Sequence, residues 1–231
     1  KIHALNNISF TINEGETVAF LGKTGSGKST ILQLISRMYD VSSGSISIDN
    51  IDIKNWNVEN LRDQIAVVPQ DAFLFSDTIK NNIQFGKENA SQEEIEHFAK
   101  IADVHKNIMR FEKGYETILG ERGITLSGGQ KQRVSIARAL IKDAPVLLLD
   151  DCLSAVDTET EERILNNLKD ISAKKTTIIV THRVSSAKNA DKIIILNDGE
   201  IIEQGTHNQL LNQKGYYNNL YNKQLAEKDV L

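Results

Sequence analysis

Eight residues, Gly22 to Ser29, constrain this chain more strongly than any other stretch. They read Gly-Lys-Thr-Gly-Ser-Gly-Lys-Ser, which is a glycine, any four residues and then Gly-Lys-Ser. The apolar run 17–21 before them predicts a buried strand, and the residues after them follow a helical spacing at Ile31, Leu34, Ile35 and Met38. Glycines between a strand and a helix let successive backbone N–H groups point into one concavity, to which the helix adds its positive end. The sequence therefore predicts a phosphate-binding loop.

The last residues of this loop indicate a nucleoside triphosphate as the ligand. Lys28 would reach the β- and γ-phosphates, and the Ser29 hydroxyl would bind Mg²⁺. A glycine-rich turn without a ligand is the alternative, but the strand and helix on either side of the loop argue against it. The residues expected to contact the nucleotide are Gly22, Lys23, Thr24, Gly25, Ser26, Gly27, Lys28, Ser29 and Thr30.

Composition limits the other partners. Of the 231 residues, 40% are hydrophobic and 25% are charged, which is ordinary for a globular protein with ample core. The net charge of −4 gives no reason to expect a nucleic-acid partner, so a phosphate site must be a local feature. The single cysteine, Cys152, excludes an internal disulfide and fits a reducing compartment. Since no apolar run approaches the roughly 20 residues that span a bilayer, any membrane role must come through a partner or through further polypeptide.

The chain is predicted to form one α/β core with an inserted helical part. The core takes about 1–70 and 143–231, where strand and helix patterns alternate, and this alternation predicts a doubly wound fold. The insertion, about 71–142, carries helical patterns and no strand that we predict. Within it, the sequence Ser-Gln-Glu-Glu from Ser91 fits a capping box and places the start of a helix there.

Apolar runs predict the buried strands of the core. In its second part these are 146–149, 177–180 and 193–196, each apolar on both faces as in a parallel sheet. In its first part, alternating apolar residues within 8–12 predict one strand, and the isoleucines of 46–53 predict short ones. After 196 the sequence predicts only a polar, mainly helical tail, with a buried side formed by Leu210, Leu211, Tyr217 and Leu220.

A carboxylate, Asp150, follows the buried strand 146–149 directly. The carboxyl end of a central parallel strand faces the ligand crevice, where a carboxylate can hold Mg²⁺. The alternative is a helix N-cap for the next segment. The glycine-rich loop favours the Mg²⁺ role, so Ser29 and Asp150 are both predicted metal ligands.

A second motif, Leu-Ser-Gly-Gly-Gln at 126–130, precedes a helix with an apolar stripe at Val134, Ala137 and Ile141. Its small residues at a helix start permit close approach to phosphate, although such a sequence alone could be an ordinary helix entry. Combined with the loop at 22–29 and with Asp150, in this order, it closely resembles the signature of ATP-binding-cassette (ABC) proteins. The resemblance extends from Leu5 to the C-terminal tail. It implies a RecA-like phosphate-loop NTPase core with an antiparallel β subdomain and an inserted α-helical subdomain, and ATP with Mg²⁺ as cofactors.

Three further positions match the family's pattern. Gln70, after a strand and Pro69, corresponds to the glutamine that reaches Mg²⁺ and the attacking water; otherwise it is a surface loop residue. His182 corresponds to the switch histidine that contacts the γ-phosphate, although a lone histidine there is more often structural. Ser-Ala-Val-Asp at 154–157 resembles the D-loop, which crosses to a partner subunit; by itself it could be a helix cap.

The resemblance implies a head-to-tail pair of such domains, with each ATP between the phosphate loop of one and the signature of the other. Binding would close the pair, and hydrolysis with release would reopen it. The residues that would serve the partner's ATP are Ser127, Gly128, Gly129, Gln130 and Asp157.

Other segments resemble the exporters of this family. Gly-Glu-Arg-Gly at 120–123 resembles the exporter X-loop, and Phe73 and Phe75, unless they are plain core residues, resemble the region that receives a membrane domain's coupling helix. We therefore expect coupling helices near Gln70–Phe75 and near Gly120–Gly123. Exporters usually join membrane helices to this domain in one polypeptide. The chain is thus expected to be a fragment that lacks N-terminal membrane helices and works at the cytoplasmic face of the cell membrane.

Two departures from the family pattern affect activity. The aromatic residue that stacks on adenine would fall before Lys1. The residue after Asp150, normally the glutamate base, is Asp151, whose carboxylate is withdrawn by about 1.5 Å, one C–C bond. Misplacement by about 1 Å can reduce a rate roughly a hundredfold. Similar sequences with aspartate here are often the slow half of a heterodimeric exporter. The intact Gln70 and His182 keep open a homodimer with a slow base.

Two other classes of protein remain as alternatives. Asp151 is the only support for a non-catalytic nucleotide-binding module that regulates a membrane complex. Chromosome-maintenance and repair ATPases carry a similar signature, but they insert long coiled coils before the Asp150-type strand, and this chain has no sustained heptads there. An ATPase domain that drives export is the reading we favour.

Overall fold

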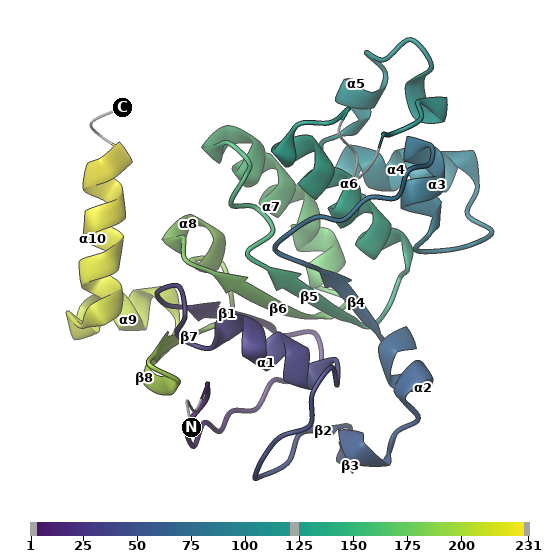
Figure 1. Ribbon diagram of the computed structural model, residues 1–231. Coiled ribbons are helices and arrows are strands. Elements are labelled where there is room, and N and C mark those ends of the chain that lie inside the picture. Colours follow the sequence, from purple (N-terminus) through teal and green to yellow (C-terminus); the bar gives the residue numbers. More distant parts are fainter. Residues whose placement is uncertain (1–3, 121–124, 229–231) are drawn as a thin grey trace.

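A six-stranded sheet organises the protein. The computed structural model describes residues 4–120 and 125–228, and their main sheet has the order β4-β5-β6-β1-β7-β8 (Figure 1). Its strands are β1 (Thr17–Leu21), β4 (Ile65–Val68), β5 (Val146–Asp150), β6 (Thr176–Thr181), β7 (Lys192–Asn197) and β8 (Glu200–Gly205). All neighbouring strands are parallel except β7 and β8, which are antiparallel. The segments that follow β1, β4, β5 and β6 therefore leave the sheet at one edge, as in doubly wound folds.

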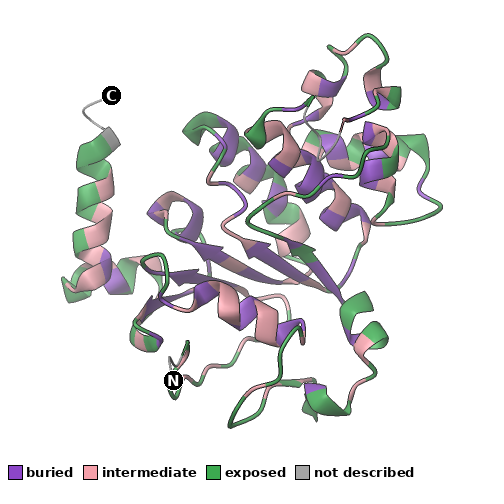
Figure 2. Cartoon of the chain, in the orientation of Figure 1, coloured by how far each residue is buried: buried purple, intermediate pink, exposed green. Residues whose placement is uncertain are grey.

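Helices cover both faces of this sheet. One face packs against α1 and a small hairpin of β2 and β3, through a cluster that includes Phe20, Leu32 and Val180. Helix α2 joins the same cluster through Leu61, and the other face packs against α3 to α10 in two clusters. Figure 2 shows the burial concentrated in the strands and in the helix faces that meet them. The further elements are α1 (Lys28–Ile35), β2 (Ser47–Ile48), β3 (Ile51–Asp52), α2 (Val58–Asp63), α3 (Ile79–Gln84), α4 (Gln92–Ile101), α5 (His105–Ile108), α6 (Gly128–Ile141), α7 (Thr158–Ser172), α8 (Val184–Ala187), α9 (His207–Gln213) and α10 (Tyr216–Lys228).

The predicted α/β class is confirmed: strands and helices alternate around a mainly parallel sheet. Helices α3 to α6 gather at one side of the molecule, while α9 and α10 lie at the opposite side (Figure 1). The predicted capping box begins α4, because Ser91 Oγ accepts from the Glu94 N–H and the Glu94 carboxylate accepts from the Ser91 N–H. Among the described residues, no helix is both long enough and apolar enough to cross a bilayer.

Three local predictions were wrong. Residues 8–12 form no strand, because their apolar side chains pack on the sheet without ladder hydrogen bonds; Phe10, for example, meets Phe20 edge-on with 5.0 Å between ring centroids. Helix α1 ends at Ile35, before the predicted Met38. Arg37 takes a left-handed φ of 51° and reverses the chain, so the Met38 side chain is 61% exposed.

The third error was to expect no strand after 196. Asp198 and Gly199 have φ of 47° and 80°, and they form the turn of a β7–β8 hairpin. An Asp-Gly pair between apolar stretches is a strong hairpin signal, since both residues tolerate positive φ. Along β8 half-buried and exposed residues alternate, as expected for an edge strand with one solvated face.

Candidate nucleotide-binding site

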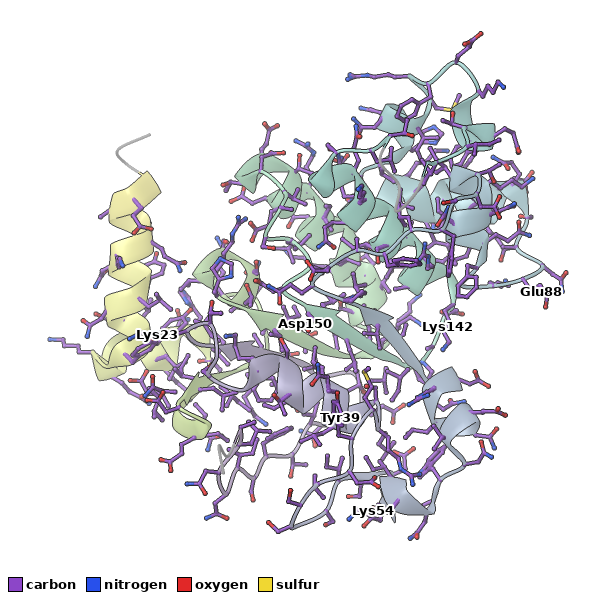
Figure 3. The ribbon with its side chains drawn as sticks, viewed as in Figure 1. Lys23, Tyr39, Lys54, Glu88, Lys142 and Asp150 are labelled. Atoms are coloured by element: carbon purple, nitrogen blue, oxygen red, sulfur yellow. The ribbon has the colours of Figure 1, made fainter. Side chains whose placement is uncertain are left out.

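Four predicted site segments meet at the carboxyl edge of the sheet. The phosphate loop follows β1, Gln70 follows β4, Asp150 ends β5 and His182 follows β6. In Figure 3, Asp150 lies at the middle of the sheet edge and Lys23 lies in the loop beyond β1. The sequence separates these segments widely, and the parallel sheet brings them together.

The loop between β1 and α1 is shaped by glycine and by one lysine. Gly27, which caps α1, has a φ of 97°, and a Cβ there would lie 2.5 Å from the Ala4 carbonyl oxygen. Only glycine fits this backbone. The Lys28 Nζ reaches back across the loop and donates to the carbonyl oxygens of Gly22, at 2.8 Å, and Lys23, at 2.7 Å. Thr24 and Gly25 form the exposed tip, Ser26 is buried, and Ser29 and Thr30 are half-buried on the first turn of α1.

Burial and the neighbouring charges shift the pKa values of Lys28 and Asp150. Burial lowers the pKa of the Lys28 ammonium group, and the carboxylates of Asp151 and Asp150 oppose that shift. Burial also raises the pKa of Asp150; the Asp151 carboxylate adds to this, whereas the Ser29 hydrogen bond and Lys28 oppose it. The Lys28 ammonium group therefore lies close enough to the Asp150 and Asp151 carboxylates for their charges to interact.

Ser29 and Asp150 are joined directly, since the Ser29 Oγ donates to the Asp150 Oδ1 over 2.7 Å. The Asp150 side chain therefore contacts α1, and it is not the N-cap of the next helix, which was the alternative role considered for it. A hydroxyl and a carboxylate oxygen are the hard ligands that Mg²⁺ accepts. The first-turn N–H groups of α1 have no intrahelical acceptors and face the loop side, which suits phosphate oxygens. The residues present therefore fit a nucleoside triphosphate with Mg²⁺.

Asp151 and His182 form the second pair of the site. The His182 Nδ1 lies 3.0 Å from both Asp151 carboxylate oxygens. Asp151 has a left-handed φ of 42°, and its N–H donates to the Val180 carbonyl over 2.7 Å, so β6 fixes its backbone. The Asp151 side chain is 16% exposed and that of His182 is 47% exposed. A sheltered carboxylate thus stands next to an accessible imidazole.

Gln70 is held by a residue that the sequence analysis did not single out. The Gln70 side chain is exposed, and the backbone carbonyl oxygen of Gln70 accepts a hydrogen bond from the Gln132 Nε2. Gln132 is 5% exposed and lies on α6, the helix that follows the Leu-Ser-Gly-Gly-Gln motif. No signal in the sequence indicated this role, because Gln132 lies on the face of the helix opposite to the predicted apolar stripe at Val134, Ala137 and Ile141.

The Leu-Ser-Gly-Gly-Gln motif starts α6, away from the phosphate loop. Ser127 and Gln130 form a capping box, with the Gln130 N–H donating to Ser127 Oγ over 3.3 Å and the Ser127 N–H donating to Gln130 Oε1 over 3.0 Å. Gly128 and Gly129 lie against Ala155, and a Cβ on Gly129 would come within 2.9 Å of the Ala155 carbonyl oxygen. The structure thus brings the motif together with the 154–157 segment.

Asp157 ends that segment as the N-cap of α7. Its Oδ1 accepts from the Thr160 N–H over 2.9 Å, and this hydrogen bond lowers the pKa of Asp157. The cap proposed as the plain alternative is therefore present. The Asp157 side chain remains exposed and lies beside the Leu-Ser-Gly-Gly-Gln motif.

A buried ion pair, also missed from sequence, connects the 154–157 segment to the residue after His182. Arg183 Nη1 donates to Glu161 Oε2 over 2.6 Å, and its Nη2 donates to the Ser154 carbonyl over 2.9 Å. Glu161 is fully buried and also accepts hydrogen bonds from the Ser185 and Ser186 hydroxyls. Glu161 lies on α7, which the segment leads into. The network fixes both segments relative to each other.

The aromatic residues after Gln70 are exposed rather than part of the core. Phe73 and Phe75 are 53% and 39% exposed, and Phe85 is 69% exposed. The Arg138 guanidinium lies 5.5 Å from the Phe75 ring centroid and donates to the Phe73 carbonyl over 2.8 Å. The core alternative for these phenylalanines therefore fails. Of the second predicted contact, only Gly120 is described; 121–123 lie outside the described residues.

A glycine-rich loop after β1, with a carboxylate that ends β5 and contacts the first turn of α1, defines a phosphate-loop nucleotide-binding domain. The family model described as ABC transporter matches residues 5–154. The chain belongs to the ABC transporter family. Domains of this family bind ATP, generally with Mg²⁺.

Relatives and solved structures agree with this assignment. The chain is 49% identical over 225 residues to the uncharacterized ABC transporter ATP-binding protein YfiB of Bacillus subtilis, covering 97% of this chain and 39% of YfiB. It is 48% identical over 224 residues to the multidrug resistance-like ATP-binding protein MdlA of Escherichia coli, covering 97% of this chain and 38% of MdlA. A structure of a bacterial Atm1-family ABC exporter with ATP bound matches with a TM-score of 0.91 and 43% identity, covering 96% of this chain and 39% of that one. The chain thus spans well under half the length of these relatives.

Proposed function

We propose that this chain is the nucleotide-binding domain of an ABC exporter, which binds and hydrolyses ATP to drive transport of a substrate across a membrane. The observation that supports this most is the convergence of Lys28, the Ser29–Asp150 pair and the Asp151–His182 pair at one sheet edge. These groups supply a phosphate-binding cation, oxygen ligands for a metal and a carboxylate with an imidazole for the attacking water.

Each group has a distinct task in this proposal. ATP with Mg²⁺ supplies the scissile phosphoanhydride and the cation that neutralises charge on the phosphates. Lys28 holds the phosphates, and Ser29, Asp150 and Gln70 offer the metal oxygen ligands. Asp151 accepts a hydrogen bond from the attacking water and orients it, while His182 positions both that carboxylate and the terminal phosphate.

We further propose a head-to-tail pair with a second nucleotide-binding domain. The Leu-Ser-Gly-Gly-Gln motif and the 154–157 segment lie together in the fold and expose Ser127 and Asp157, as residues that serve a partner's nucleotide require. Because Asp151 replaces the usual glutamate, we propose an asymmetric heterodimer in which this chain's own loop retains ATP and hydrolyses it slowly. A homodimer with a slow aspartate base is the second candidate.

Coupling to a membrane domain completes the proposal. The exposed phenylalanines near Gln70–Phe75, and Gly120–Gly123, are the proposed contacts for coupling helices. Relatives are named as multidrug export proteins and as an ATP-dependent lipid A-core flippase of Vibrio vulnificus, which is the basis for proposing export. The chain would then be one part of a longer polypeptide, held at the cytoplasmic face of the cell membrane by transmembrane segments.

The replacement of Lys28 by alanine tests the enzymatic part. The loss of a buried cation that contacts the transferred phosphate should reduce the ATPase rate by at least about a hundredfold. Hydrolysis is measured as phosphate release by the purified chain, and nucleotide binding by a fluorescent ATP analogue. The control is Lys174→Ala, an exposed lysine in the turn after α7, which should behave as wild type.

Two outcomes would contradict this proposal. Equal phosphate release from wild type and Lys28→Ala would show that the measured activity does not come from the phosphate loop. ATP binding by the wild-type chain without hydrolysis, alone or with a second nucleotide-binding domain, would favour the non-catalytic regulatory module.

A further inference from the structure

One glutamine of the C-terminal helix α10, Gln224, forms hydrogen bonds with the backbone beside the switch histidine, His182. The Gln224 Nε2 donates to the His182 carbonyl oxygen over 2.8 Å, and the Gln224 Oε1 accepts from the Val184 N–H over 2.8 Å. Both ends of a single amide are therefore used on the two residues that flank Arg183. An amide side chain presents one donor and one acceptor side by side, which matches this pair of backbone groups.

The backbone segment that Gln224 contacts, 182–184, lies where the chain leaves the sheet. Strand β6 ends at Thr181 and α8 begins at Val184, so His182 and Arg183 lie between two regular elements. Arg183 is tied to the 154–157 segment by its guanidinium, and its N–H donates to Thr181 Oγ1 over 3.0 Å. The Gln224 amide adds two hydrogen bonds to the backbone on either side of Arg183.

Helix α10 is anchored mainly at its start. Tyr217 is fully buried, and its hydroxyl lies 2.6 Å from the His207 Nδ1. The Glu203 carboxylate of β8 accepts from the N–H groups of Tyr216 and Tyr217, which caps the helix. Figure 1 shows the rest of α10 extending away from the sheet, and Figure 2 shows exposed and half-buried residues along its described part, with none that is buried. Gln224, in this outer part, is therefore a specific link from a peripheral helix to the site.

We propose that Gln224 is a positioning residue for hydrolysis: it fixes the backbone at 182–184 so that the His182 imidazole stays against the Asp151 carboxylate. This rests on the proposed function of the site. Through Gln224, the placement of α10 sets how often the site is assembled for hydrolysis, without changing how the phosphate loop holds ATP. Most of the proposed nucleotide contacts come from the β1–α1 loop, whereas the Gln224 hydrogen bonds go to the backbone of His182 and Val184.

The variants to test are Gln224→Leu, which removes both polar atoms at similar volume, and Gln224→Glu, which keeps the acceptor for Val184 but places an oxygen against the His182 carbonyl. Both should lower kcat about tenfold, as expected for a misplaced catalytic group that keeps most of its contacts. The KM for ATP should stay within about twofold, because the loop at 22–29 is unchanged. Lys223→Ala, an exposed neighbour on the same helix, is the matched control.

Two further measurements separate positioning from a loss of structure. In the His182→Ala background, Gln224→Leu should lower kcat no further, because the residue it positions is already gone. The ¹⁵N resonances of the His182 ring should shift or broaden in Gln224→Leu and remain unchanged in Lys223→Ala. The NMR readout does not need turnover, so it tests the link even if the ATPase proposal fails.

The contradicting results are specific to this link. An unchanged kcat and unchanged His182 resonances in both Gln224 variants would overturn it, as would an equal loss of kcat in the presence and absence of His182. If Gln224→Leu is less folded than wild type by circular dichroism, Gln224→Glu carries the test. A wild-type chain without ATPase activity would instead count against the proposed function.

Discussion

Replacing Asp151 with glutamate is expected to raise the rate of ATP hydrolysis at this chain's own site by about a hundredfold. The added methylene extends the carboxylate by about 1.5 Å. At present both Asp151 oxygens face the His182 Nδ1 at 3.0 Å, so the carboxylate is held close to the imidazole. A longer side chain can keep that contact with one oxygen and offer the other to the attacking water.

The rate gain expected for glutamate is larger than the loss of fold stability that the backbone conformation at this position imposes on it. Asp151 has a φ of 42°, where aspartate is favoured over longer residues. The left-handed conformation costs a glutamate on the order of 1 kcal/mol, and this cost falls on the stability of the fold. A hundredfold rate increase corresponds to about 2.7 kcal/mol of the activation barrier. The two effects are separable because thermal melting reports the first and turnover the second.

The measurement is phosphate release per active site with the second nucleotide-binding domain present. Asp151→Asn is the matched control, since it keeps the length and the tolerance for positive φ but removes the charge, and it should lower turnover further. An Asp151→Glu variant with wild-type turnover would refute the slow-site proposal. The homodimer with aspartate as its working base would then be favoured.

The sequence predicted best those features that depend on local pattern and strand order alone. Strand β1 was predicted with its observed bounds, because an apolar run before a glycine-rich loop leaves little freedom. Asp150 was expected at the ligand crevice because it ends a central parallel strand, whereas His182 was predicted only from the resemblance to the ABC family. Their direct contacts, such as that between Ser29 and Asp150, required the three-dimensional order of the strands.

The sequence could not predict features that depend on partners distant in the chain. Strand β1 lies between β6 and β7, and no pattern near residue 17 indicates these neighbours. The importance of Glu161 and Gln224 follows from the position of Arg183 and of the 182–184 backbone, which only the fold brings near. Strand β8 was missed for a different reason, because its Asp-Gly turn is a hairpin signal that is present in the sequence itself.

Replacing Glu161 with alanine is expected to destabilise the fold most among the substitutions considered. Glu161 is fully buried and its Oε2 lies 2.6 Å from the Arg183 Nη1. Removal of one partner leaves the Arg183 charge without its counter-ion and the Ser185 and Ser186 hydroxyls without an acceptor. Breaking a buried pair typically costs 3–5 kcal/mol, and because Arg183 retains some access to water we expect about 3 kcal/mol of unfolding free energy. For a chain of this size, Tm should fall by roughly 6–12 °C.

The neighbouring Glu162→Ala is the matched control, because it removes an exposed carboxylate from the same turn of α7 and should change Tm little. Glu161→Gln should fall between the two, since an amide can still accept from Arg183 and the serines but carries no charge. Arg183 also holds the Ser154 carbonyl, so Glu161→Ala should weaken activity at the partner's site even at temperatures where the domain is folded. Equal melting temperatures for Glu161→Ala and Glu162→Ala would mean that the buried Glu161–Arg183 pair does not stabilise the fold.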